Sequence, residues 1–244
     1  MKALLLIVFI LSSLSVIGTP LQDGTYFSTF LGQPISAHNK LTLKLNNQTT
    51  HQTAHYQSNP LEDSPYYVIR IEKWADQKGW GIEWIHHKLY LQNRPSTISH
   101  FSLSDGFNLL LISRSLKPNN WIFRIGGGAV LAHPDVQITG RSRFHTPGFS
   151  GNYLAGPALQ TSAERWLYES STHFISFEIK LTAASFNIPI STQSSEYASG
   201  IDTAIHFAIG FGSKPIQQRS IKSFGQFISP SLWLGAGMIA APTN

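Results

Sequence analysis

The chain has 244 residues with no cysteine, 13 % charged residues, 12 % aromatic residues and a formal net charge of +5. The charged share is about half that of an average soluble domain, and the lack of cysteine excludes a scaffold held by disulfides. Because the basic residues are spread along the chain and do not cluster, we expect no nucleic-acid partner.

A signal peptide is predicted over residues 1–18. Lys2 precedes an apolar run over 3–11, which has the length of a secretory hydrophobic region and is too short for a membrane-spanning helix. We expect a Sec-type signal that is cleaved after Gly18. No later stretch has the length of a transmembrane helix, so a helical membrane protein is not expected.

Residues 19–65 are predicted to form an N-terminal segment with short strands and a loop. Gly32 and Pro34 interrupt any strand early in this segment, and a short strand is expected over 41–45. A turn-rich loop follows over 57–65.

From residue 66 onward, apolar and polar residues alternate with the two-residue period of β-strands. The predicted strands cover 66–72, 79–91, 98–115, 121–133, 153–168, 172–188 and 201–212. A long loop is expected over 134–151, and a tail or an extra strand over 213–244. The pattern predicts an all-β fold, namely a closed antiparallel up-and-down transmembrane β-barrel of 8–10 strands with its core at 66–212.

The two faces of each strand decide between a soluble and a membrane protein. The strand at 201–212 places Ile205 and Ile209 on one face, and Asp202 and His206 on the other. A soluble sandwich turns its charged face to water, whereas an outer-membrane barrel turns its apolar face to lipid and its charges to the lumen. Because acids and bases both occur on the polar faces, we favour a barrel whose charges pair across a narrow lumen. The predicted lumen network consists of Arg70, Glu72, Glu83, His87, Arg124, Glu178, Lys180, Asp202 and His206.

The lumen histidines form a first candidate site. Adjacent His86 and His87 point to opposite faces of a strand and cannot chelate one ion together, so no metal site is predicted, and we expect no cofactor. His87 is expected near Glu83, Asp202 and His206. This set acts either as a general base with its orienting carboxylate or as a hydrogen-bonded network that fixes the shape of the barrel.

His100 and Ser102 form a second candidate site, because they share one face of the strand at 98–115. This His-x-Ser spacing resembles that of the outer-membrane lipid A deacylases. The resemblance implies His100 and Ser102 as catalytic residues that cleave an acyl ester from the outer wall of a barrel, with Phe101 and Phe107 facing inward. The deacylase motif continues with Asn, whereas Leu103 follows Ser102 here.

Several longer segments together resemble a group of uncharacterised Gram-negative outer-membrane β-barrel proteins. They are GIEWIHHKLYL (81–91), SLSDGFNLL (102–110), GGGAVLAHPD (126–135), YLAGPALQ (153–160) and AIHFAIGF (204–211). The resemblance implies an outer-membrane barrel and brings no settled activity. This chain departs from the family pattern with Asp105 in place of His and Phe107 in place of Tyr, and it continues past Phe211, where such barrels usually end on an aromatic residue.

We therefore expect a structural or interaction barrel in the outer membrane of a Gram-negative bacterium. Its lumen is expected to be filled with polar side chains, its surroundings to be membrane lipid and lipopolysaccharide, and its long loops to meet external partners. Two alternatives remain open at this stage. One is an acyl hydrolase that acts on lipid A or phospholipid, and the other is a soluble periplasmic ligand-binding β-barrel.

Overall fold

The structure is a computed structural model, and it describes residues 20–59, 65–146 and 151–215. The predicted signal peptide at 1–18 and almost all of the predicted tail at 213–244 lie outside these residues. Within the described residues, no helix is long and apolar enough to cross a membrane.

Thirteen strands make up one continuous antiparallel sheet within these residues. Eight of them are long: β1 (Gly24–Ser36), β5 (Tyr67–Ala75), β6 (Lys78–Leu91), β7 (Ile98–Leu116), β8 (Trp121–Ala132), β11 (Tyr153–Glu169), β12 (His173–Pro189) and β13 (Tyr197–Ser213). The other five are β2 (Asn39–Leu45), β3 (Gln48–Ala54), β4 (Tyr56–Gln57), β9 (Asp135–Ile138) and β10 (Phe144–His145).

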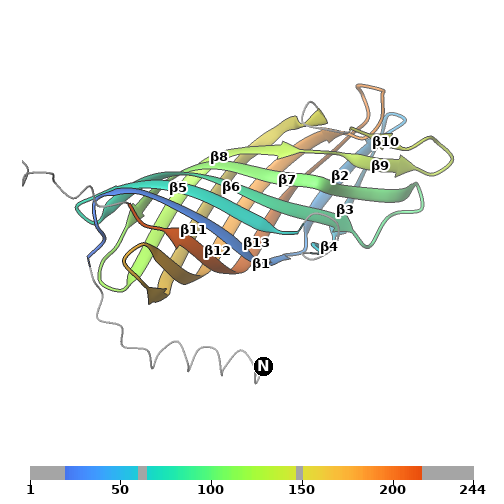
Figure 1. The fold of residues 1–244 in the computed structure, drawn as a ribbon. Coiled ribbons are helices and arrows are strands. Elements are labelled where there is room, and N and C mark those ends of the chain that lie inside the picture. Colours follow the sequence, from blue (N-terminus) through green and yellow to red (C-terminus); the bar gives the residue numbers. More distant parts are fainter. Residues whose placement is uncertain (1–19, 60–64, 147–150, 216–244) are drawn as a thin grey trace, which may run out of the picture.

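The eight long strands close into a barrel, as Figure 1 shows. Each strand pairs with its neighbour in chain order, and β13 pairs back onto β1 over ten residue pairs from Phe27↔Ser213 to Ser36↔Ala204. Every pairing in the ring is antiparallel. The predicted all-β, closed antiparallel up-and-down barrel is therefore confirmed, at the lower bound of the expected strand number.

The barrel begins at Gly24, so the predicted start of the core at residue 66 is wrong. The expected breakers of the N-terminal segment lie inside β1. Its pairing with β5 ends at Leu31, so Pro34 lies where one edge of the strand has no ladder partner, the position at which a sheet tolerates proline. At Gly32, the carbonyl of Phe207 lies 2.2 Å from where a Cβ would be, so the sheet requires glycine there.

The five short strands gather at one end of the barrel, which we call the long-loop end (Figure 1). The β2–β3 hairpin extends β13, β4 pairs with β6, and the β9–β10 hairpin extends β7. The opposite end, called the short-turn end, has tight links such as Asp76-Gln77, whose φ angles are 51° and 62°. The loop predicted over 134–151 is thus wrong in part, because it contains β9 and β10.

The predicted faces of the wall strands are found in the structure. Ile209 and Phe211 on β13 are about half exposed on the outer wall, at 52 % and 54 %, whereas Asp202 and His206 on the same strand are at most 1 % exposed. Figure 1 shows a single closed wall of strands, so the buried charges face the inside of the barrel.

The inside of the barrel is filled in three layers. A cluster of aromatic and aliphatic residues that includes Trp74 and Trp166 closes the short-turn end. Charged side chains occupy the middle, and a larger apolar cluster that includes Leu89 and Phe107 occupies the long-loop end. Space is so short that a Cβ at Gly210 would lie 2.3 Å from the ring of Phe30.

Candidate functional site

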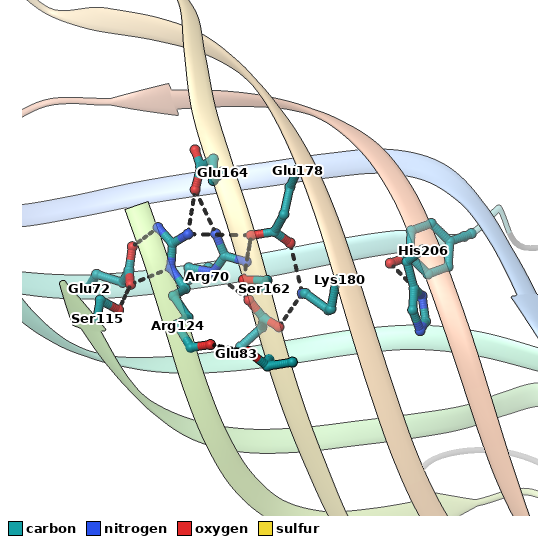
Figure 2. A network of polar contacts seen from close by, with 12 residues as sticks. Arg70, Glu72, Glu83, Ser115, Arg124, Ser162, Glu164, Glu178, Lys180 and His206 are labelled. Atoms are coloured by element: carbon teal, nitrogen blue, oxygen red, sulfur yellow. Dashed lines mark hydrogen bonds and ion pairs between the residues drawn. The ribbon is translucent and has the colours of Figure 1, made fainter. Parts of the chain in front are cut away.

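Arg70 stands at the centre of the charged layer (Figure 2). Its guanidinium reaches three carboxylates from three different strands. Nε donates to Glu83, Nη1 lies 3.1 Å from Oε2 of Glu164, and Nη2 lies 2.6 Å from Oε2 of Glu178. The same guanidinium lies 4.5 Å from the centre of the Phe30 ring. All five donors of an arginine have a fixed planar geometry, so this one residue fixes the relative positions of β5, β6, β11 and β12.

Arg124 forms the second centre of the layer. It donates from Nε and Nη2 to the two oxygens of Glu72 at 2.8 and 2.7 Å, which is a bidentate pair. Its Nη1 lies 2.7 Å from Glu164, and Ser115 donates to Glu72 at 2.6 Å. Figure 2 shows both arginines sharing Glu164.

Lys180 completes the layer. Its Nζ contacts Glu83 and lies 3.1 Å from Oε1 of Glu178. Three cations thus meet four carboxylates, and each of these side chains is at most 5 % exposed. A charge taken out of water is stable only when it is paired, and this set pairs every member.

Sequence reasoning missed Glu164. Its strand alternates less regularly than the others, and a bulge interrupts the pairing of β11 with β8 between Leu154 and Gly156. The signal present in the sequence is the inward row Gln160, Ser162 and Glu164. Glu164 pairs directly across from Glu178 on β12, so two like charges lie side by side and require the arginines between them.

A second polar group lies between the charged layer and the apolar cluster. His87 Nε2 lies 3.4 Å from Oδ2 of Asp202, and the rings of His87 and His206 are 5.5 Å apart. His206 contacts the hydroxyls of Thr182 at 2.9 Å and Tyr66 at 3.1 Å. The structure therefore brings together three of the four residues predicted for this set.

The fourth predicted member, Glu83, is bound to Arg70 and Lys180 instead, and so it does not orient His87. His86 points away from His87, stacks on Tyr67 and contacts Asn108 at 2.8 Å. The prediction that the adjacent imidazoles face opposite sides of the strand thus agrees with the geometry.

The His100–Ser102 pair lies on the outer wall at the long-loop end. Phe101 and Leu103 belong to the inner apolar cluster, so the residues between and beside them point outward. His100 Nε2 lies 3.1 Å from Ser102 Oγ and 3.4 Å from Oδ2 of Asp135 on the paired strand β9.

Asp135 is held by Arg143, which donates to both of its oxygens. Burial raises the pKa of this carboxyl. The hydrogen bonds from Arg143 and the nearby imidazole of His100 lower the pKa by more than burial raises it, so the pKa lies below its usual value. In a Ser-His-Asp triad the carboxylate holds the imidazole nitrogen that faces away from the serine. Here Asp135 and Ser102 face the same nitrogen, and Ser102 is fully buried.

The comparisons with known proteins identify no family. The sequence matches no protein-family model and no curated protein. Among solved structures, the chain is similar to Neisserial surface protein A at 10 % identity, covering 79 % of this chain and 97 % of that one, with a TM-score of 0.38. For the outer membrane protein AlkL in lipid bilayers the values are 9 % identity, 81 % and 94 % coverage, and a TM-score of 0.46. The outer membrane protein OprG from Pseudomonas aeruginosa is 11 % identical, the match covers 80 % of this chain and 98 % of that one, and the TM-score is 0.35.

Proposed function

We propose that the protein is an outer-membrane β-barrel of a Gram-negative bacterium with a sealed lumen and a structural or interaction role. The observation that carries the proposal is the reversed burial of its side chains. Charged residues of both signs are enclosed by a closed wall of strands, and large apolar residues cover the outside of that wall. A β-barrel satisfies all its backbone hydrogen bonds without an edge, so it meets the requirement for crossing a membrane.

The outer wall supports contact with acyl chains. Its exposed apolar side chains come from every strand of the ring: Phe27, Leu31, Ile35, Ile69, Ile71, Trp80, Ile82, Leu110, Ile112, Leu116, Phe123, Ile125, Leu159, Ile175, Leu181, Ile201, Ile209 and Phe211. A soluble monomer rarely exposes a contiguous apolar patch larger than a few hundred Å². This argues against the soluble ligand-binding barrel that the sequence also allowed.

The filled interior supports a structural or interaction role over a diffusion pore. The charged layer fixes the cross-section, and apolar clusters occupy both ends of the lumen. The long-loop end is the candidate surface for external partners, because outer-membrane barrels have short periplasmic turns and longer extracellular loops. Lipid and lipopolysaccharide are the expected neighbours of the wall.

Cell fractionation tests the location and the topology together. We expect the full chain in the outer-membrane fraction, resistant to extraction by salt and alkali, with heat-modifiable mobility in detergent. A folded chain that is released as a water-soluble protein would contradict the proposal.

Acyl hydrolysis is a second candidate, supported by the 3.1 Å contact between His100 and Ser102 on the outer wall. It requires Asp135 to leave Nε2 of His100 and the cover over Ser102 to open. Ser102→Ala in the reconstituted barrel is expected to abolish release of fatty acid from lipid A or phospholipid, with heat-modifiability unchanged. Lipid that stays intact with the wild-type barrel would remove this candidate.

A further inference from the structure

Three loop segments meet around Arg141 at the long-loop end. Its Nη1 donates to Glu196 at 2.8 Å, and its Nη2 donates to Oδ1 of Asn46 at 2.7 Å. Glu196 also accepts hydrogen bonds from the Asn46 backbone at 3.2 Å and from Ser191 at 2.6 Å. These contacts tie the β9–β10 loop to the turn of the β2–β3 hairpin and to the loop before β13.

Arg141 separates two adjoining cavities. The first has a volume of about 330 Å³ and lies between the β2–β3 hairpin, the loop before β7 and the end of β9. The second, of about 180 Å³, lies between the β9–β10 hairpin and the loop that follows β12. Ile138 and Arg141 line both cavities, so the two cavities adjoin at these residues, and we call the pair the loop cleft.

The wall of the first cavity is rich in neutral hydrogen-bonding groups. Gln48, Thr50, Ser96, Thr97 and Thr139 line it from three separate segments. The hydroxyls of Thr50 and Thr139 donate to the backbone carbonyls of Leu43 and Ser96, and their oxygens keep the capacity to accept a hydrogen bond. Its apolar surface comes from two aliphatic side chains, Leu45 and Ile138. In the second cavity, Ser191, Thr192 and Gln193 face the apolar side chains of Phe144 and Ile190.

The cleft carries no unbalanced charge among its lining residues. Arg141 is neutralised by Glu196, and Arg143 by Asp135. Burial raises the pKa of Glu196, but hydrogen bonds from Ser191, the Asn46 backbone and Arg141 lower it by more than burial raises it. The pKa of Glu196 therefore lies below its usual value, and the carboxylate stays ionised. A strongly anionic or cationic ligand therefore has no opposite charge to meet.

We propose that this cleft binds a neutral oligosaccharide, with one sugar unit in each cavity. Sugars present several hydroxyls that donate and accept hydrogen bonds, and their carbon–hydrogen faces pack on apolar side chains. Both kinds of surface line the two cavities. The larger cavity also lies within the size range of known small-molecule sites. The inference rests on the proposed function, in which the long-loop end faces outward, and the sugar belongs either to a soluble glycan or to lipopolysaccharide of the same leaflet.

The test uses the full-length barrel, refolded in detergent, with neutral gluco-, galacto- and manno-trisaccharides as probes in titration calorimetry. We expect saturable binding of at least one of them by the wild type. Thr50→Trp fills the first cavity and is expected to weaken binding by about tenfold or more. Thr49→Trp is the matched control, because its side chain points to the opposite face of β3, and it is expected to bind like the wild type.

Gln48→Ala provides a second variant that keeps the hairpin intact, with an expected loss of about threefold to tenfold. Equal affinities for the wild type, Thr50→Trp and Gln48→Ala would overturn the proposal, as would binding that is confined to phosphorylated sugars and lost in salt. Heat-modifiability of the same samples is read separately. A folded, membrane-inserted barrel that binds none of the trisaccharides refutes the sugar site and leaves the proposed function standing.

To identify the source of the sugar, the affinity for the soluble trisaccharide is measured with the barrel in vesicles of phosphatidylethanolamine, with and without lipopolysaccharide. If lipopolysaccharide occupies the cleft, it lowers the apparent affinity for the soluble trisaccharide in the wild type and in Thr49→Trp. If the natural ligand is a soluble glycan, the affinity is the same in both kinds of vesicle. Either result supports the site, provided that Thr50→Trp loses binding.

Discussion

The wall of the barrel and its long-loop end follow different rules, although the same strands run through both. In the wall, each strand has one face toward the outside and one toward the lumen, as the pair Arg124 and Ile125 shows with 3 % and 68 % exposure. At the long-loop end, β6 is buried on both faces, and the consecutive residues His86, His87, Lys88 and Leu89 are all buried.

This difference separates charges that are buried and stabilise the barrel from charges that join loops at the protein surface. Inside the wall, a buried charge is stable only when it is paired, and each of the three cations and four carboxylates of the charged layer contacts a group of opposite charge. At the long-loop end, ion pairs such as Arg141–Glu196 join loops at the edge of water. There the same kinds of side chain hold together the loops that line the proposed sugar site.

The largest effect is expected from removing the centre of the charged layer. Arg70→Met leaves Glu83, Glu164 and Glu178 without their common partner. We expect a loss of about 3–5 kcal/mol in the free energy of unfolding, because uncompensated buried charges remain. Urea unfolding of the barrel in detergent or vesicles measures it.

Arg114→Met is the matched control on the outer wall, where the guanidinium lies over the ring of Trp80 at 5.1 Å. Loss of this partly exposed contact is expected to cost about 1 kcal/mol or less. Equal effects of the two arginine variants would contradict a paired role for the charges in the lumen.

A charge on the apolar wall is expected to have the next largest effect. Ile125→Arg places a cation in the apolar belt and is expected to cost about 2–4 kcal/mol in a bilayer. Leu154→Arg, an equally exposed position near the long-loop end, is expected to cost about 0–1 kcal/mol. In a water-soluble protein both changes would be close to neutral, so unfolding of the two variants in vesicles separates the alternatives.

The smallest effect concerns Asp135 and is expected to depend on pH. Because its pKa is lowered in the folded protein, its contribution is complete above the ordinary carboxyl pKa of 3.8 and is lost as the pH falls through the lower, folded value. Arg143 is about half exposed, so solvent screening keeps this contribution at about 1 kcal/mol or less.

Hydrogen exchange of the backbone amides in β9 and β10 measures how much Asp135 stabilises this hairpin. Protection in the wild type should decrease below pH 3.8, whereas Asp135→Asn should show the weaker protection at both neutral and acidic pH. Protection that is independent of pH in the wild type would contradict the role of the Asp135–Arg143 pair.

Sequence patterns predicted the wall well, because burial there depends on one variable, the face of the strand. The inward placement of Arg70, Arg124 and Lys180 follows from alternation alone. Alternation does not say which acid meets which base, since that depends on strand register and on contacts across the lumen. Glu83 was therefore expected beside His87 and is bound to Arg70 instead.

The long-loop end was predicted less well, for two physical reasons. The residues of β3 are almost all polar, so the strand has no apolar face to reveal it, and it is held by backbone pairing to β2. The carboxylate beside His100 comes from β9, a strand that lies inside a predicted loop, and only the pairing of Ser102 with Asp135 brings the two together. Contacts of this kind depend on hairpin geometry that local periodicity does not contain.

Spin labelling at residue 125 tests the central claim most directly, and the chain has no native cysteine to interfere. A label on Ile125→Cys in lipid vesicles should be accessible to molecular oxygen, which concentrates among acyl chains, and shielded from a water-soluble nickel complex. A label on Leu154→Cys, near the long-loop end, should show greater access to the nickel complex. If the label at residue 125 were instead freely accessible to the nickel complex, the apolar wall would face water and the proposed membrane barrel would be wrong.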